Sequence, residues 1–294
     1  MADFGSLITA MVTPFDENLK INWGVLEDLV RDLVEEQKTE SIIVSGTTGE
    51  SPTLSREEKL DLFREVRRLA PPECKVIAGT GTNNGAEVLD LSKRAEDCGV
   101  DGLMIVTPYY NKPPQDALIA HYHSIAASVS LPIMIYNVPG RTGCDIDREA
   151  LQELSSVSNI VALKEASGDL NKISWLKKEA GDNLKIYSGN DDQTLPLLAL
   201  GGEGVVSVAS HVTGRKIREM IKNFKQGDHE KALKLHHEMY PIFKVMFLVT
   251  NPIPVKASVQ MRGIDVGGVR PPLVPLKEAE RKRISDVLQE NGIL

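Results

Sequence analysis

The most chemically distinctive residue is a lysine at the end of an apolar run. Residues 160–163, Ile-Val-Ala-Leu, lead directly into Lys164, and the turn-forming residues 167–169 follow it. A short apolar run next to turn residues predicts a buried parallel strand. Burial disfavours the ammonium form, whose ordinary pKa is about 10.4. The neutral amine is a nucleophile that forms Schiff bases with carbonyl compounds. From this segment alone, the alternative is a strand-end lysine that reaches solvent along its own stem.

Two other predicted strands end in residues with hydroxyl or phenol groups. Thr47 and Thr48 lie in a glycine-flanked turn after one strand. Their hydroxyls and the free backbone N–H groups of the turn would form a compact cradle for a small carboxylate. Tyr109 and Tyr110 follow a later strand in a loop bounded by prolines. We expect one of them to face a site and the other an interface.

A phenol and a guanidinium follow the next predicted strand. Tyr136 ends this strand, and Arg141 comes five residues later. A phenol can carry protons, and a guanidinium can hold a carboxylate. Taken singly, Tyr136 could be a strand-end aromatic and Arg141 a surface charge. Together with Lys164 they suit an imine-forming enzyme that acts on a small keto acid.

The rest of the chain must bring these groups together. Apolar runs that predict strands alternate with amphipathic segments that predict helices, and the runs cover residues 6–12, 42–44, 76–78, 102–106, 133–136, 160–164, 184–188 and 205–208. The expected helices begin after Asn22, at the capping box Ser55–Glu58, near Asp147 and Asp169, and after Gly214. This alternation predicts a (β/α)8 TIM barrel, whose active site lies at the carboxyl ends of the strands. A doubly wound sheet is the weaker alternative, because no G-x-G-x-x-G loop follows any strand.

The alternation stops after residue 226. We expect a catalytic barrel over residues 1–226 and a C-terminal helical domain over residues 227–294, with residues 251–254 as a break between two helices. No low-complexity linker separates the two parts, so we expect the helices to pack on the barrel.

Composition limits the class of protein. The 294 residues are 41% hydrophobic and 26% charged, with a net charge of −7, which argues against a nucleic-acid or basic membrane surface. The chain contains three cysteines, no signal-peptide pattern and no apolar run of membrane-spanning length. We therefore expect a cytoplasmic protein with no nucleic-acid or membrane partner.

The chain resembles the pyruvate-dependent class I aldolase superfamily and, within it, the dihydrodipicolinate synthase family. The resemblance covers essentially the whole chain. It rests on Gly46-Thr47-Thr48-Gly49-Glu50, Pro108-Tyr109-Tyr110-Asn111, Tyr136-Asn137-Val138-Pro139-x-Arg141-Thr142-Gly143, Lys164-Glu165-Ala166 and Asn251-Pro252-Ile253-Pro254-Val255-Lys256.

The resemblance implies a role for each strand-end residue. Lys164 would form the Schiff base with pyruvate. Thr47, Tyr136 and Tyr110 would form a proton relay, with Tyr110 supplied by a neighbouring subunit. The remaining implied contacts are Thr48 with the pyruvate carboxylate, the backbone of Val206 in the wall of its pocket, Gly189 leaving room beside the imine, and Arg141 with the carboxylate of the second substrate.

The resemblance also implies the reaction and the assembly. Pyruvate would condense with L-aspartate 4-semialdehyde in lysine and diaminopimelate biosynthesis, with no metal or organic cofactor. Family resemblance favours a homotetramer built as a dimer of dimers.

Three alternatives remain open at this point. N-acetylneuraminate lyase and the 2-keto-3-deoxy sugar acid aldolases resemble the same core, but Arg141 favours a second substrate with a carboxylate over a polyhydroxylated one. A non-catalytic keto-acid sensor would need the pocket but not the proton relay. A metal-dependent barrel is poorly supported, since only His211 of the six histidines lies near a strand end, where packing is its more ordinary role.

Some family members are inhibited by lysine at a subunit interface. Ser51, Asn83, Glu87 and Tyr109 match the residues that bind this effector. Arg56 and Lys59 replace the histidines of lysine-sensitive bacterial members. Because two fixed cations should oppose a cationic ligand, we expect weak or absent inhibition by lysine.

Overall fold

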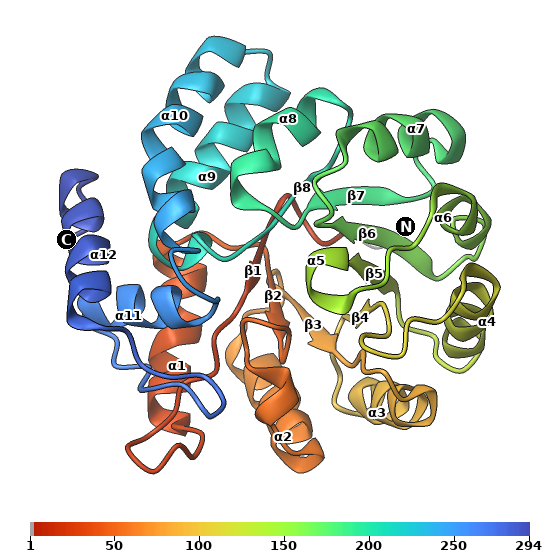
Figure 1. Ribbon diagram of the computed structural model, residues 1–294, viewed down its shortest axis with the longest axis horizontal. Coiled ribbons are helices and arrows are strands. Elements are labelled where there is room, and N and C mark those ends of the chain that lie inside the picture. The colour runs from red at the N-terminus through yellow and green to blue at the C-terminus, as the bar shows by residue number, and fades with distance from the viewer. Residues whose placement is uncertain (1–2) are drawn as a thin grey trace.

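The computed structural model describes residues 3–294 and contains a closed barrel of parallel strands in sequential order (Figure 1). The strands are β1 (Leu7–Ala10), β2 (Ser41–Val44), β3 (Lys75–Gly79), β4 (Gly102–Val106), β5 (Ile133–Asn137), β6 (Ile160–Glu165), β7 (Lys185–Ser188) and β8 (Gly204–Ser207). β8 pairs with β1 and closes the barrel. The predicted (β/α)8 fold is confirmed, and most strand ends differ by only one or two residues from those expected.

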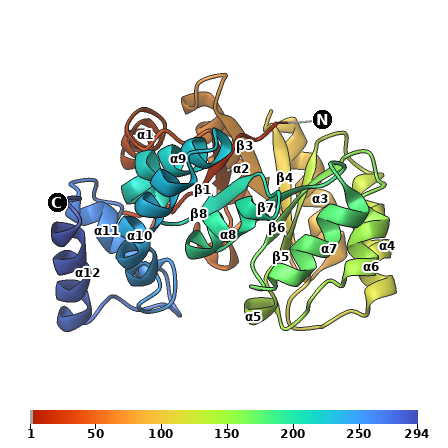
Figure 2. The ribbon, with the colours of Figure 1, turned by 90° about the horizontal axis from the view of Figure 1, so that it is seen from above.

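Helices surround the barrel and continue beyond it. They are α1 (Trp23–Arg31), α2 (Arg56–Leu69), α3 (Gly85–Asp97), α4 (Gln115–Ala126), α5 (Pro139–Thr142), α6 (Arg148–Leu154), α7 (Leu170–Ala180), α8 (Thr194–Ala199), α9 (Ser210–Lys225), α10 (His229–Val245), α11 (Ile253–Met261) and α12 (Glu278–Glu290). Figure 2 shows α11 and α12 on the opposite side of the barrel from α4 and α6. Within residues 3–294, no helix combines the length and the apolar character that crossing a bilayer requires.

The caps that the sequence predicts begin the expected helices. Asn22 accepts a hydrogen bond from the Val25 amide at the start of α1. Ser55 and Glu58 form a complete capping box before α2. Asp147 and Asp169 cap α6 and α7. In each case a side-chain oxygen satisfies a backbone donor that the first turn leaves free.

The helix expected after Gly214 is present, and α9 also includes a short first turn from Ser210, separated from it by a kink at Thr213 (φ −140°, ψ 24°). The Ser207 hydroxyl accepts a hydrogen bond from the Ser210 amide in this first turn, and the Asp191 carboxylate accepts from the Val208 and Ala209 amides just before it. Gly214 directly follows the kink, where its amide donates to the Gln37 side chain and a Cβ atom would meet the Gln37 backbone oxygen at 2.5 Å.

Alternate strand residues face the barrel interior and the helix layer. Interior positions form one apolar cluster, which includes Ile8, Ile43, Ile77, Met104, Met134, Tyr136, Tyr187 and Val206. Outward positions form a second and larger cluster with the surrounding helices. The C-terminal helices belong to this second cluster through residues such as Met239, Val255 and Ile284. They therefore pack on the barrel.

A bulge interrupts this alternation in β6. Ile133 pairs with Ile160, but the next residue of β5, Met134, pairs with Ala162. Val161 and Ala162 consequently both lie in the interior cluster, whereas Ile160 lies in the outer one. Strict alternation from Ile160 would turn residue 164 outward, and the extra residue turns it inward.

The segment after α10 contains the break that the sequence predicts at residues 251–254. α10 ends at Val245 and α11 begins at Ile253. A third helix, α12, follows and packs against both.

Candidate active site

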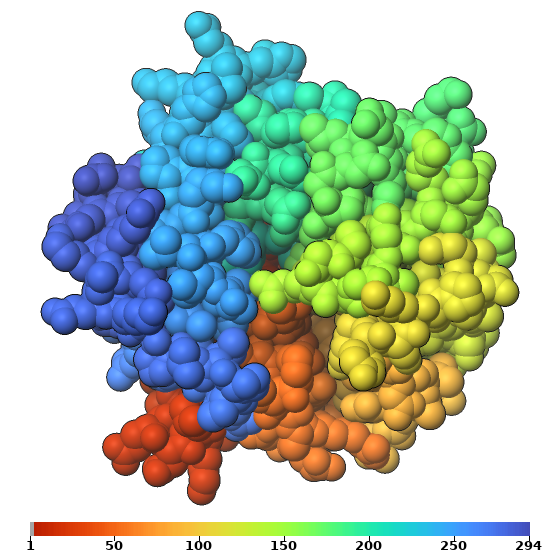
Figure 3. All heavy atoms as spheres, viewed as in Figure 1, coloured from red at the N-terminus to blue at the C-terminus, as the bar shows by residue number. Residues whose placement is uncertain are grey.

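A cavity of about 220 Å³ lies at the carboxyl end of the barrel. Figure 3 shows this face hollowed between the orange residues after β2 and the yellow-green residues around α5. The lining residues are Ser45, Gly46, Thr47, Ser51, Pro52, Gly79, Gly81, Met104, Val106, Tyr109, Tyr136, Val138, Arg141 and Thr142. Thr47, which follows β2, shares this lining with Tyr136 at the end of β5 and with Arg141 on α5.

Lys164 is buried directly beside the cavity. Its side chain lies against Tyr136, with the ammonium nitrogen 4.0 Å from the centroid of the phenol ring. Burial lowers the pKa of Lys164 to about 7; the Asp191 carboxylate opposes this shift and the Arg141 charge adds to it. A large fraction of the amine is therefore neutral near pH 7 and able to attack a carbonyl carbon.

Tyr136 remains protonated under the same conditions. Burial raises the pKa of its phenol, while the Arg141 charge and a hydrogen bond with Thr47 act in the opposite direction. A neutral phenol beside a neutral amine can supply a proton to a developing alkoxide and take one back.

The turn that carries Thr47 and Thr48 is held in a strained conformation. Ser45 and Glu50 flank it and both have left-handed backbone conformations, with φ of +55° and +56°. The Thr48 hydroxyl is buried and accepts a hydrogen bond of 2.9 Å from the side-chain amide of Asn251. Because that bond uses the hydroxyl oxygen as acceptor, its proton remains free to donate to a ligand.

A buried ion pair attaches the same turn to the C-terminal helices. The Lys256 ammonium on α11 lies 3.0 Å from the Glu50 carboxylate, and both side chains are only 2% exposed. Glu50 also accepts a hydrogen bond from the Arg270 amide, and Lys256 lies over the Phe15 ring. The strained Glu50 backbone is thus fixed by contacts from residues more than 200 positions away in the sequence.

Three other residues expected at the site, Val206, Gly189 and Tyr110, are not part of the cavity lining. Val206 belongs to the apolar cluster inside the barrel. Gly189 packs closely on the residues that follow Lys164, because a Cβ atom there would lie 2.6 Å from the Ala166 Cβ. Tyr110 is 88% exposed and has a left-handed φ of +75°.

Two of the four residues matched to an effector site lie in the lining of the same cavity. Ser51 and Tyr109 line it. The pKa of Tyr109 is raised, first by burial and then by the Glu87 carboxylate. Lys59 is buried, and burial lowers its pKa while Glu87 opposes the shift. Arg56 makes an ion pair of 3.0 Å with Asp90.

Several polar residues around the site had no role in the sequence analysis. Asn137 and Glu165 directly follow Tyr136 and Lys164, and they form a buried network with Lys172 and Asp145. Lys256 was likewise given no role from the sequence. Asn137, Glu165 and Lys256 lie inside the motifs that carry the family resemblance, which was the one sequence feature that pointed to them. Their hydrogen-bond and ion-pair partners are visible only in the fold.

Neither the cysteines nor the acidic and histidine side chains of residues 3–294 form a metal site. Cys74, Cys98 and Cys144 are free thiols, and burial raises the pKa of each. Across residues 3–294, no group of three or more His, Cys, Asp or Glu side chains is placed to hold a metal ion. His211 is fully buried and packs within α9, where its ring accepts a hydrogen bond from the Val12 amide.

A TIM barrel with a buried lysine and a tyrosine at the carboxyl ends of neighbouring strands is typical of enzymes that work through a Schiff base. A family model described as the dihydrodipicolinate synthetase family matches residues 3–291. The chain belongs to this family.

Individual members of the family are similar to this chain over almost its full length. The chain is 47% identical to the 4-hydroxy-tetrahydrodipicolinate synthase of Desulforudis audaxviator, covering 99% of both chains. It resembles the crystal structure of a dihydrodipicolinate synthase from Bacillus anthracis with a TM-score of 0.96 and 46% identity, covering 98% of this chain and 99% of the other. The lysine-bound structure from Cyanidioschyzon merolae gives a TM-score of 0.97 and 42% identity, covering 99% of each chain.

Proposed function

We propose that this enzyme is a 4-hydroxy-tetrahydrodipicolinate synthase, a lyase of lysine and diaminopimelate biosynthesis that condenses pyruvate with L-aspartate 4-semialdehyde. The observation that carries the proposal is the buried Lys164 amine with a pKa of about 7, in contact with Tyr136 beside the cavity. The high identity to named synthases over the whole chain supports the same conclusion.

The reaction begins with imine formation. The neutral amine of Lys164 attacks C2 of pyruvate, whose carboxylate binds the Thr48 hydroxyl and the free N–H groups of the turn. The C2 oxygen receives one proton from the attacking Lys164 nitrogen and one from Tyr136, and it leaves as water while the protonated imine forms. The protonated imine then withdraws electrons from C3, so loss of a C3 proton produces an enamine.

Condensation and release follow from the enamine. Its C3 carbon attacks the aldehyde carbon of the second substrate, and the relay of Thr47, Tyr136 and Tyr110 protonates the new alkoxide. The amino group of the same substrate then attacks C2 and closes the ring. Lys164 is displaced as the free amine. All of these steps use only side-chain and backbone groups of the enzyme, and we propose that it needs no metal or organic cofactor.

Arg141 gives the site its preference for the second substrate. It lies on α5 in the cavity lining, and within residues 3–294 its side chain makes no ion pair. A guanidinium at this position binds a carboxylate in two parallel hydrogen bonds, whereas a polyhydroxylated sugar tail would need neutral donors and acceptors. Val206 and Gly189 shape the wall of the pyruvate pocket.

Tyr110 connects the function to the assembly. The Tyr110 phenol is 88% exposed, and its residue has a left-handed backbone conformation. On an isolated subunit it would contact mainly solvent and could not take part in the reaction. In our proposal it enters the cavity of a neighbouring subunit in a homotetramer arranged as a dimer of dimers. We place the enzyme in the cytoplasm, where its three free thiols stay reduced.

The proposed effector site comprises Ser51, Asn83, Glu87 and Tyr109. The position of Lys59 beside Glu87 supports weak or absent regulation by lysine, because the carboxylate already faces a cation of the protein.

Borohydride trapping tests the central step. The protein is incubated with pyruvate and reduced, and its intact mass and peptide map are then measured, with Lys164→Ala as the control. We expect one reduced pyruvate adduct per chain, located on Lys164 and lost in the control. A folded protein without an adduct would exclude the aldolase mechanism and favour a keto-acid sensor.

A second assay identifies the aldehyde. Turnover of pyruvate is measured with aspartate 4-semialdehyde and, separately, with sugar aldehydes and N-acetylmannosamine. The synthase proposal requires turnover with the first substrate. Turnover with the sugar substrates alone would assign the chain to the lyase or sugar-acid aldolase activities.

A further inference from the structure

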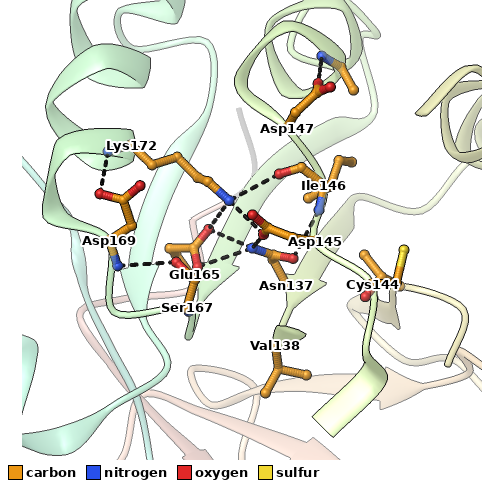
Figure 4. A network of polar contacts seen from close by, with 12 residues as sticks. Asn137, Val138, Cys144, Asp145, Ile146, Asp147, Glu165, Ser167, Asp169 and Lys172 are labelled. Carbon is orange, nitrogen blue, oxygen red and sulfur yellow. Dashed lines mark hydrogen bonds and ion pairs between the residues drawn. The ribbon is translucent and has the colours of Figure 1, made fainter. Parts of the chain in front are cut away.

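Four polar residues form a network on the outer face of the barrel, directly behind the reactive side chains. We define the Lys172 network as Asn137, Asp145, Glu165 and Lys172 (Figure 4). Asn137 and Glu165 pair across β5 and β6 in the same register that pairs Tyr136 with Lys164. Because neighbouring residues of a strand face opposite sides, Tyr136 and Lys164 face the interior while Asn137 and Glu165 face the helix layer.

Asn137 joins three segments through its side chain. Its amide nitrogen lies 3.0 and 3.1 Å from the two Glu165 carboxylate oxygens and 2.7 Å from the Asp145 carboxylate. Its amide oxygen accepts a hydrogen bond of 3.3 Å from the Ile146 backbone. The end of β5, the end of β6 and the segment before α6 are therefore held at one point.

Lys172 supplies the positive charge of this network. Its ammonium donates to the Asp145 carboxylate at 2.6 Å and to the Ile146 backbone oxygen at 3.0 Å, and it lies 4.0 Å from Glu165. The Lys172 and Glu165 side chains are only 5% and 1% exposed, so solvent screens these charges weakly. Without the ammonium, the two carboxylates would repel each other across Asn137.

The network closes both ends of the loop that carries Arg141. The loop leaves β5 at Asn137, passes through α5 with Arg141, and returns to the network at Asp145 and Ile146. Arg141 makes no ion pair within residues 3–294, so the backbone of this loop determines where its guanidinium lies. The pairing of Tyr136 with Lys164 is supported separately by the β5–β6 hydrogen bonds.

We propose that Lys172 is a positioning residue for the second substrate. The proposal rests on the proposed function, in which Arg141 holds the carboxylate of aspartate 4-semialdehyde. Lys172 fixes Asp145 and Ile146 against Glu165, and this fixes Arg141 relative to the imine on Lys164. Removing the ammonium should loosen the Arg141 loop while the strand pairing keeps imine formation intact.

The test compares four variants, Lys172→Met, Lys172→Arg, Asp145→Asn and Lys177→Met, with the wild type. The measurements are steady-state kinetics with each substrate varied and the rate of formation of the borohydride-trapped pyruvate adduct. Lys172→Met removes the charge and keeps the approximate length of the side chain. Asp145→Asn weakens the contact from its half-exposed partner and is the milder change for folding. Lys177→Met is the matched control, because Lys177 lies on the same helix and is ion-paired to Asp182 at 3.0 Å, outside the network.

We expect Lys172→Met and Asp145→Asn to raise KM for aspartate 4-semialdehyde by about tenfold or more, since small displacements of a binding group have large kinetic effects. KM for pyruvate and the adduct rate should stay within about twofold of the wild type, and Lys172→Arg should recover part of the loss. Lys177→Met should match the wild type.

Three results would overturn the inference. One is an unchanged KM for the aldehyde in folded Lys172→Met, or in Asp145→Asn if Lys172→Met does not fold. Another is an equal loss for both substrates, which would indicate a structural role only. The third is an effect of the same size in Lys177→Met. Absence of a pyruvate adduct in the wild type would instead refute the proposed function, and this inference with it.

Discussion

Tyr136 and Lys164 lie opposite each other on β5 and β6, and a single extra residue in β6 makes both side chains face the barrel interior. Ile133 pairs with Ile160 and Met134 with Ala162, so the bulge at Val161 turns the Lys164 side chain into the barrel. There the ammonium nitrogen lies 4.0 Å from the centroid of the Tyr136 ring. β-Bulges are frequent next to active sites because they redirect a side chain without changing the fold.

The buried Lys164 amine should make stability depend on pH. Its pKa is about 7 in the folded protein and near 10.5 in the unfolded chain, so below pH 7 both states are protonated and the folded state bears the full cost of a buried charge. Between these values the unfolded chain binds a proton that the folded protein does not, and stability rises with pH. Each unit of pKa difference corresponds to about 1.4 kcal/mol.

Lys164→Met should therefore be more stable than the wild type by a few kcal/mol at pH 6 to 7, as about 1.4 kcal/mol per pKa unit implies. This advantage should shrink as the pH approaches 10. Urea unfolding of both proteins at several pH values measures the difference. A difference that does not change with pH would show that the pKa of Lys164 is not lowered. In the wild type, the rate of imine formation should rise with pH through about 7 and then level off.

Replacing Arg141 should weaken binding of one substrate only. Arg141→Gln removes a charge-assisted pair with the carboxylate, and such bonds contribute about 1.5–3 kcal/mol, or roughly 10- to 100-fold in KM. We expect that increase for aspartate 4-semialdehyde and little change for pyruvate. Arg148→Gln, at a neighbouring arginine that lies over the Trp175 ring, is the control. Equal increases for both substrates would contradict the assigned role.

Tyr110 should act in the active site of a neighbouring subunit. Tyr110→Phe and Lys164→Ala, each almost inactive alone, should recover activity when they are co-expressed, because one site of each hybrid dimer is then intact. Random pairing predicts recovery of about a quarter of the wild-type activity. Tyr136→Phe with Lys164→Ala should show no recovery, since both residues belong to the same subunit. If neither combination recovers activity although hybrids form, Tyr110 works within its own chain or not at all.

Lysine should inhibit this enzyme weakly or not at all. The Lys59 ammonium is buried beside Glu87, and Arg56 lies near it in a pair with Asp90, so an incoming cation meets fixed positive charge. Inhibition is measured as initial rate against lysine concentration. The double replacement Arg56→His and Lys59→His should increase sensitivity at neutral pH. Strong inhibition of the wild type at millimolar or lower lysine would show the expectation to be wrong.

Lys256 should stabilise both the fold and the pyruvate site. Lys256→Met leaves the Glu50 carboxylate buried without its partner, which costs about 3–5 kcal/mol when one member of a buried pair is removed. Urea unfolding should show that loss, and the double variant with Glu50→Gln should recover part of it. Because Glu50 ends the strained turn of Thr47 and Thr48, KM for pyruvate should rise as well. A single variant with wild-type stability would exclude this role.

The sequence by itself determined the architecture and the chemical class. Eight apolar runs alternating with capped amphipathic segments are compatible with few folds, and in the barrel all the strand ends meet at one face. That rule brings Thr47, Tyr136 and Arg141 to one face, and it places Lys164 at the same end. The family motifs then implied the reaction. The assignment of these residues to individual steps, and the division at residue 226, stay predictions.

Only the tertiary structure decided how these groups are aimed and held. A bulge leaves no clear sequence signal, because Val161 and Ala162 are apolar whichever way they face, yet it directs Lys164 inward. Partners such as Lys172 for Asp145, or Lys256 for Glu50, join segments that sequence spacing cannot relate, 206 residues apart in the second case. Periodicity records which residues are buried. The low pKa of Lys164 depends first on its removal from water and then on the Asp191 and Arg141 charges that the fold places near it.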